Sequence, residues 1–178
     1  MIEEPLFKYS CPQGEFQDTL IDIDGHVIWQ TPWQSNLIVD GLRRVLAALI
    51  KGEGQALTFW AVGTGQNSWD SLPPVLPGDD ERRQLTRLYR ETKRKPIPAN
   101  QMVFVGGTSS SPSNQLQIRV DFLAEDIPTI GDRQLREFGL ISGGIANPNT
   151  GVLINHRIHP RIDLQEGFTL QRTLRLTF

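Results

Sequence analysis

Residues 168–178 read FTLQRTLRLTF and carry the clearest strand pattern in the chain. Every second side chain, from Phe168 to Phe178, is apolar with one exception, and the side chains between them are polar. Successive side chains of an extended chain point to opposite faces, so this pattern predicts an antiparallel strand with one buried face. Arg172 is the exception, because it places a cation on the apolar face.

The same alternation extends back along the chain. Residues 115–123 place Leu116, Ile118, Val120 and Phe122 on one face and polar side chains on the other. Shorter apolar runs of strand length occupy residues 56–62, 102–105, 135–141 and 152–159. These stretches predict a protein built mainly of half-buried antiparallel strands.

An N-terminal β-hairpin is predicted around Asp24 and Gly25. This pair readily supplies the two positive-φ residues of a two-residue hairpin turn, and residues 19–23 and 26–30 flank it with strand-forming side chains. Residues 1–34 are therefore interpreted as an N-terminal arm that ends in a hairpin.

One long amphipathic helix is predicted from Asn36 to Lys51. Its apolar side chains recur at three- and four-residue spacing, Ser35 or Asn36 can cap its start, and Gly52 can end it. A shorter helix is expected from Asp80 to Arg90. The predicted fold class is mainly β (α+β): an antiparallel β-sandwich of about seven or eight strands with one long packed helix, formed by residues 35–178.

Composition excludes several classes of protein. The 178 residues carry a formal net charge of -2, which offers no field for binding nucleic acid through bulk electrostatics. No apolar stretch approaches the roughly 20 residues of a membrane span, and the first twenty residues contain no secretory signal pattern. We expect no nucleic-acid partner, no membrane span and synthesis in a cytoplasm. Cys11, the single cysteine, cannot form an internal disulfide.

Motifs for metal binding are weak. His156 and His159 are three residues apart, which in a strand places them on opposite faces. Asp22, Asp24 and Gly25 resemble the start of a calcium loop, but the bidentate glutamate that such a loop needs downstream is missing. We expect no metal site.

Motifs for catalysis and cofactor binding are weak as well. Gly63 and Gly65 follow a strand without the third glycine or the Gly-Lys ending of a phosphate loop, and Ser109 to Ser111 lack a nucleophile elbow. We therefore expect no catalytic residue, no cofactor and a protein that is not an enzyme.

Aromatic residues supply the candidates for an interface. Phe7, Tyr9 and Phe16 lie among prolines and polar residues in the arm, a composition that can order against a partner. We expect the arm and hairpin to carry much of the contact between subunits while the rest of the chain folds without them. The alternative is that the arm covers the sandwich of its own chain.

Trp69 is the fourth interface candidate. It lies in a loop rich in Gly, Ser and Pro, beside Asn67 and Asp70, which makes it a candidate for contact with a partner or stacking on a sugar. The alternative is that its ring folds back onto the domain. Trp60, inside an apolar strand, is expected in the core.

Four segments, read together, resemble the N-terminal domain of phage tail-collar and tail-fibre proteins and related parts of contractile injection systems. They are SNLIVDGLRRVLAALIKGE (35–53), LTFWAVGTGQNSWDSLP (57–73), ERRQLTRLYR (81–90), and LREFGLISGG (135–144) with GVLINHRIHPRIDLQEGFTLQRTLRLTF (151–178). Positions that look equivalent to that family's are Gly63, Gly65, Glu81, Arg83, Glu137, Gly139, Leu140 and Arg157. In that family a long shaft and a receptor-binding tip usually follow this domain, and we expect this chain not to be a whole fibre.

The resemblance implies a non-enzymatic structural subunit of a phage tail or injection particle: a baseplate, fibre-attachment, collar or cap component. It further implies several copies in a symmetric assembly, other tail or baseplate proteins as partners, and a place in the virion tail or injection particle. A carbohydrate-binding β-sandwich is the alternative function, motivated by Trp69.

Overall fold

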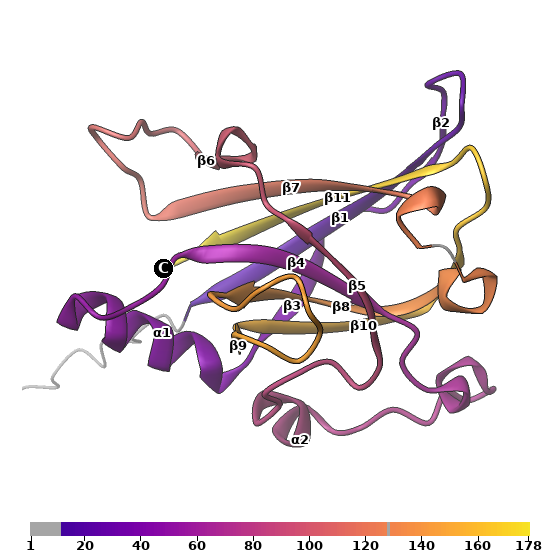
Figure 1. The fold of residues 1–178 in the computed structure, drawn as a ribbon, viewed down its shortest axis with the longest axis horizontal. Coiled ribbons are helices and arrows are strands. Elements are labelled where there is room, and N and C mark those ends of the chain that lie inside the picture. Colours follow the sequence, from indigo (N-terminus) through magenta and orange to yellow (C-terminus); the bar gives the residue numbers. More distant parts are fainter. Residues whose placement is uncertain (1–11, 128) are drawn as a thin grey trace, which may run out of the picture.

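Eleven antiparallel strands form a single sheet in the computed structural model, which describes residues 12–127 and 129–178 (Figure 1). The strands are β1 (Gln13–Ile21), β2 (Val27–Gln30), β3 (Gln34–Ile38), β4 (Leu57–Gly63), β5 (Glu91–Pro96), β6 (Met102–Phe104), β7 (Gln115–Leu123), β8 (Gln134–Ser142), β9 (Val152–Leu153), β10 (Asn155–Asp163) and β11 (Thr169–Thr177). The helices are α1 (Asp40–Lys51) and α2 (Asp79–Arg83), with four short 3₁₀ turns, Asn67–Asp70, Ala99–Gln101, Ala124–Asp126 and Ile130–Arg133.

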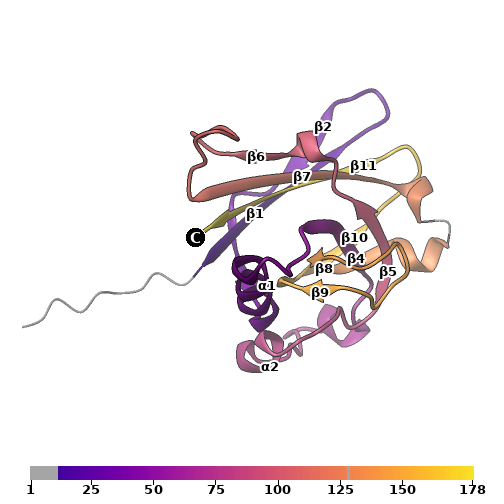
Figure 2. The ribbon, with the colours of Figure 1, turned by 60° about the vertical axis from the view of Figure 1, so that its left-hand side comes forward.

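The sheet curls until it resembles half of a barrel. Its strand order is β5-β4-β8-β10-β3-β1-β11-β7-β6, with β2 added to β1 and β9 added to β8. Figure 2 shows β1, β11 and β7 lying over β10, β8 and β4. The mainly β prediction is confirmed, but the predicted seven- or eight-strand sandwich is replaced by this continuous sheet, because β3 pairs with both β1 and β10 and joins the two layers.

The apolar core fills the inside of the curl and draws on both layers. Phe16 of β1 meets Phe138 of β8 edge to face, with ring centroids 5.1 Å apart, and Trp60 of β4 lies 5.6 Å from the same ring. Phe16 is 1% exposed and Trp60 is fully buried, which confirms Trp60 as a core residue. Aromatic contacts at these distances stabilise a core beyond the burial of their area.

The strands predicted at residues 115–123 and 168–178 are confirmed. β7 and β11 pair along their whole length, from Thr169 opposite Leu123 to Thr177 opposite Gln115. The predicted apolar face of each strand points into the curl: Ile118, Val120, Phe122, Leu170, Leu174 and Leu176 are all buried. Arg172, on that same face, is completely buried too.

The N-terminal hairpin is present, but its loop is longer than the predicted two residues. β1 ends at Ile21 and β2 begins at Val27, and the N–H of Asp22 donates to the carbonyl of His26 across the loop. Gly25 adopts a φ of 85°, as a turn glycine can. β1 itself begins at Gln13 and lies between β3 and β11, inside the sheet.

Both predicted helices are shorter than expected. Residues 34–38 form β3, with Asn36 opposite Gly14 of β1, so α1 starts at Asp40 without the side-chain cap expected from Ser35 or Asn36. Gly52 ends α1 in the left-handed conformation, as predicted.

The second helix stops at Arg83 instead of Arg90. The backbone N–H groups of Tyr89 and Arg90 donate to the carboxylate of Glu137, and this partner holds them outside a helix. Among the described residues, no helix combines the length and apolar character needed to cross a membrane.

The position of β1 yields a prediction about truncation. Deleting residues 1–17 would remove Gln13 to Gln17 from the middle of the sheet and Phe16 from the core, where losing one phenylalanine side chain costs about 3–5 kcal/mol. This chain is expected to lose its cooperative thermal transition in circular dichroism. Deleting residues 1–11 should leave the transition intact, and a Δ1–17 chain that melts like the full chain would contradict the placement of β1.

Candidate functional site

A bulge in β10 brings two cavities together. β10 pairs with β8 on both sides of the bulge. Between the two paired segments, β10 has three residues, His159, Pro160 and Arg161, whereas β8 has only Arg136. These three residues and Asp163 line both cavities. The larger cavity, about 740 Å³, is here called the outer cleft, and the smaller, about 430 Å³, is called the slit.

The slit opens where the two layers of the sheet separate. β3 pairs with β1 only at residues 14–16 and with β10 only at residues 155–156, so beyond β3 no described strand pairs with both β1 and β10. The slit lies in that gap, with Asp18 and Leu20 of β1 and Trp29 of β2 on one side and the β10 bulge on the other.

A buried charged cluster lies at the base of the slit. Nη2 of Arg172 donates to Oδ2 of Asp18 at 3.1 Å and to Nε2 of His159 at 2.7 Å. Arg172 is fully buried, Asp18 is 2% exposed, and the guanidinium of Arg172 stacks on Phe138 at 4.5 Å. Buried charges are tolerated when they are paired, and here a cation, an anion and an aromatic face share one site.

The hydrogen bonds assign the state of His159. Its Nδ1 lies 2.8 Å from the carbonyl of Pro160, to which it donates, so Nε2 is the nitrogen that accepts from Arg172. Burial, and then the charge of Arg172, hold the pKa of His159 well below its usual range. His159 is therefore a neutral imidazole in the fold. Burial also raises the pKa of Asp18, although Arg172 opposes that shift.

Three polar atoms of this cluster are buried without a hydrogen-bond partner. They are Oδ1 of Asp18 and Nε and Nη1 of Arg172. Nearly all buried polar atoms in folded proteins find a partner, so one buried acceptor and two buried donors at the base of the slit call for a specific explanation.

The outer cleft is bounded by a loop that a second buried arginine holds in place. Nε and Nη2 of Arg136 donate to the carboxylate of Asp70, and Nη1 donates to the carbonyls of Thr64 and Gln134. The hydrogen bond from Arg136 holds the pKa of Asp70 below its usual range. Residues 64–78 are thereby tied to the start of β8, and the loop forms one wall of the cleft.

Trp69 points into the protein from this loop. Its side chain is 5% exposed, and its ring packs perpendicular to Tyr89 with centroids 5.3 Å apart. Gly65 allows this packing, since a Cβ there would lie 2.0 Å from the Trp69 ring. Of the two alternatives for Trp69, the structure therefore has the one in which the ring folds back onto the domain.

The other interface candidates divide in two. Phe16 is part of the core and contacts Phe138, so its ring does not face a partner. Phe7 and Tyr9 lie outside the described residues.

The two strand histidines lie in separate surroundings, as their spacing indicates. Nε2 of His156 lies 2.9 Å from Oε2 of Glu137, and both residues are fully buried. Glu137 also accepts the N–H groups of Tyr89 and Arg90. His159 packs against Phe138 instead, with ring centroids 6.0 Å apart.

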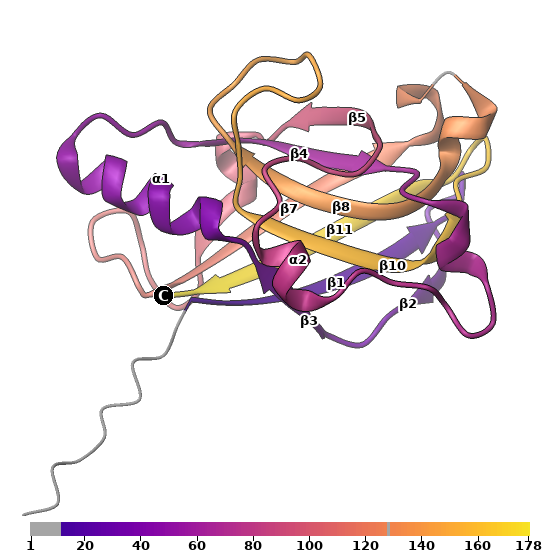
Figure 3. The same cartoon turned by 90° about the horizontal axis from the view of Figure 1, so that it is seen from below.

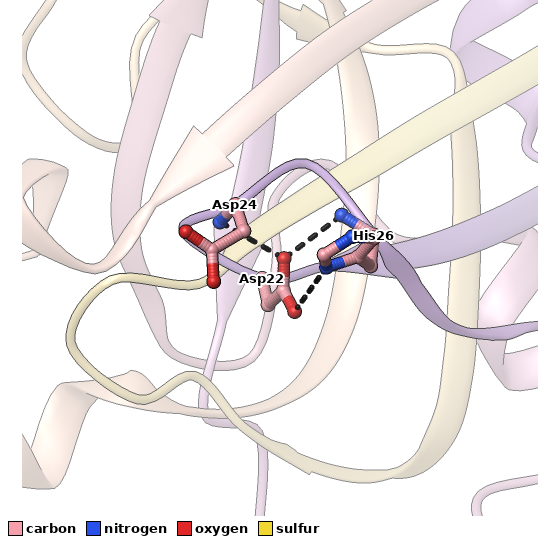
Figure 4. Close-up of side chains that lie close together, drawn as sticks. All are labelled: Asp22, Asp24 and His26. Carbon is pink, nitrogen blue, oxygen red and sulfur yellow. Dashed lines mark hydrogen bonds and ion pairs between the residues drawn. The ribbon is translucent and has the colours of Figure 1, made fainter.

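Asp22, Asp24 and His26 gather at the hairpin tip (Figure 4). In the described part of the chain they are the one group of three such side chains close enough to hold a metal ion together. Oδ1 of Asp22 accepts the N–H groups of Asp24 at 3.0 Å and His26 at 2.8 Å, and Oδ2 lies 3.3 Å from Nδ1 of His26. These hydrogen bonds lower the pKa of Asp22, that from the His26 N–H most. The cluster therefore has a structural explanation as the clasp of the turn.

No family model, curated protein or solved structure matches this chain. The site residues that sequence reasoning missed are Asp18 and Arg136. The need for a buried anion such as Asp18 could have been inferred from Arg172, because a cation on the apolar face of a central strand requires a buried partner.

The buried imidazole predicts a pH dependence of stability. In the unfolded chain His159 takes up a proton near pH 6.5, whereas the fold keeps it neutral, so the free energy of unfolding falls as the pH drops below 6.5. Between pH 7 and 5.5 the full chain should lose about 1 kcal/mol more than the His159→Gln variant. Urea unfolding at the two pH values measures this difference. His26→Gln, at the exposed hairpin tip, is the matched control and should follow the unmodified chain; equal losses in all three proteins would contradict the assignment.

The Arg136 clamp predicts how the loop responds to proteolysis. Arg136→Met breaks the contacts to Asp70 and Thr64, so thermolysin should cut within residues 66–78 several-fold faster than in the unmodified chain. Arg161→Met is the control, because Arg161 reaches Asp70 only at 3.7 Å and is half-exposed. Mass spectrometry of the fragments locates the cuts. Equal cutting rates in the two variants would show that the clamp does not hold the loop.

Proposed function

We propose that this chain is a non-enzymatic structural subunit of a phage tail or phage-tail-like contractile injection particle. One observation carries the proposal: large apolar side chains stand exposed around the β10–β11 turn. They are Ile23 (82% exposed), Leu72 (96%), Leu76 (52%) and Ile130 (79%), here called the turn face. Exposed apolar side chains that gather on one part of a monomer are typical of an interaction surface.

The turn face comes from four separate segments. Ile23 lies next to Gly167 in the β10–β11 turn, since a Cβ placed on Gly167 would be 3.6 Å from Cβ of Ile23. Ile130 shares a depression with Gln165 and Glu166, and Leu72 and Leu76 share the outer cleft with Asp163. Figure 3 shows these loops gathered at the end of the molecule opposite α1. Contact with a partner would explain why four large apolar side chains stand exposed together at this end of the molecule.

His159, which lines both cavities, is not placed to act as a general base. His159 has both ring nitrogens occupied, by Arg172 and by the Pro160 carbonyl, and no Ser or Cys hydrogen-bonds to it. A general base must be within reach of the proton that it removes. This favours a structural role, as does the resemblance of residues 35–178 to tail-collar and tail-fibre domains.

Multi-copy assembly with other tail or baseplate proteins, and a place in the tail or injection particle, are part of the same proposal. The N-terminal arm, with Phe7 and Tyr9, is a second contact candidate. Because β1 begins at Gln13, the part of the arm that precedes the sheet is residues 1–12.

The alternative is a carbohydrate-binding module, and it needs a different site. Trp69 is buried and Asp70 is engaged by Arg136, so neither is available to stack on or bind a sugar at the loop surface. What favours this alternative is the slit, where Trp29 is partly exposed beside polar groups.

Assembly is tested by substituting the turn face. In the organism that encodes the chain, Leu72→Glu together with Ile130→Glu should reduce incorporation into purified particles at least ten-fold, measured by quantitative mass spectrometry with electron microscopy of the particles. The physical reason is that a buried interfacial carboxylate without a partner opposes association.

Ile50→Glu is the matched control. Ile50 is 90% exposed on α1, away from the turn face, so this variant should incorporate normally. Particles of unchanged composition that never contain the protein would refute the structural role. Normal incorporation of the double variant would refute the turn face as its contact surface.

A further inference from the structure

We propose that the slit between β1–β2 and β10 binds a neutral polyhydroxyl ligand of the sugar class. The slit is about 430 Å³, within the size range of small-molecule sites. This inference does not rest on the particle assignment, and its failure would leave that assignment untouched.

The base of the slit holds unmet hydrogen-bonding capacity. Asp18 is 2% exposed and lines the slit, and its Oδ1 has no partner. Behind it, two nitrogens of the fully buried Arg172 also have none. Arg172 does not itself line the slit, so Asp18 is the member of the pair that a ligand there can meet. A hydroxyl group can donate to a carboxylate oxygen and accept from other groups, so a ligand rich in hydroxyls suits this lining.

The walls offer two kinds of surface. Trp29 stands opposite Leu20 in the β1–β2 ladder, and the two side chains give the slit an apolar side. Thr31, Gln34 and Arg161 line the slit as polar groups. An apolar aromatic surface facing a few polar side chains suits a molecule with a C–H face and hydroxyls around its edge.

Charge argues for a neutral ligand. The charged side chains that line the slit are Asp18, Asp163 and Arg161, and Arg172 lies behind them. Arg172 pairs with Asp18 at 3.1 Å, and Arg161 pairs with Asp163 at 3.1 Å. Two carboxylates and two guanidinium groups therefore balance, which leaves no net field to select an anion or a metal cation.

Indole N–H signals of the ¹⁵N-labelled full chain can report binding directly. Glucose, galactose, mannose and N-acetylglucosamine are titrated separately to millimolar concentrations, with N-acetylneuraminic acid, glucosamine and inorganic phosphate as charged comparisons. At least one neutral sugar is expected to shift the Trp29 indole signal saturably, while that of Trp60, fully buried in the core, stays unchanged. Binding of the charged probes should be weaker.

Two substitutions locate the site. Trp29→Leu should weaken binding of that sugar about ten-fold or more. Trp33→Leu is the matched control, because the Trp33 ring is covered by Arg175 at 4.2 Å and does not line the slit. Arg161→Met leaves Asp163 without its cation, and the slit should then bind glucosamine more tightly than the unmodified chain does.

Three results would overturn the proposal: no saturable shift of the Trp29 signal with any neutral sugar of the panel, tighter binding of N-acetylneuraminic acid or phosphate than of every neutral sugar, or equal weakening by Trp29→Leu and Trp33→Leu. Retention of the thermal transition in each variant shows that a loss of binding is not a loss of fold.

Discussion

The ion pair between Arg172 and Asp18 is the contact on which the rest of the sheet depends. The two residues face each other directly across the β1–β11 ladder, and both point into the core. A one-residue slip of β1 would turn Asp18 to the outside and leave a bare guanidinium among phenylalanine and leucine side chains, at a cost of several kcal/mol. His159 extends the pair to β10, so a single buried cation sets the register of one layer and contacts the other.

Buried arginines recur as the means by which this chain orders its loops. Arg136 reaches from β8 to the 64–78 loop, and Arg94 reaches from β5 to the carbonyls of Ile145 and Thr150 in the 143–151 loop, each at 3.0 Å. Each guanidinium is planar and offers five donors, so one side chain can serve a carboxylate and several carbonyls. Glu137 plays the complementary part, since its carboxylate accepts two backbone N–H groups and faces His156. Long loops are therefore held by a few charges taken out of water.

Period-two alternation predicted the strands well, because it reflects the burial of one face and needs no knowledge of neighbours. The closure of the sheet was not predictable in this way, since a strand that joins two layers has the same alternation as one within a sandwich. The start of the long helix was missed for a related reason: residues 36–38 fit the apolar spacing of the helix, but their backbone pairs with β1 and β10 as part of β3.

The site residues, too, could be predicted only in part, because their partners are distant in the sequence. Arg172 was visible in the sequence as a break in the apolar face, yet its partners come from strands 154 and 13 residues away along the chain. The sequence left the position of Trp69 open between the loop surface and the domain, and only the structure shows that Gly65 gives the ring a place to fold inward. The pairing of β1 with β11 finally has a consequence for synthesis: β1 leaves the ribosome before every other described strand, but its main partner, β11, leaves after all of them. Until residues 169–177 emerge, β1 can pair only with β2 and β3, and its other edge stays open to wrong partners. The half-barrel therefore closes only after residues 169–177 have been translated.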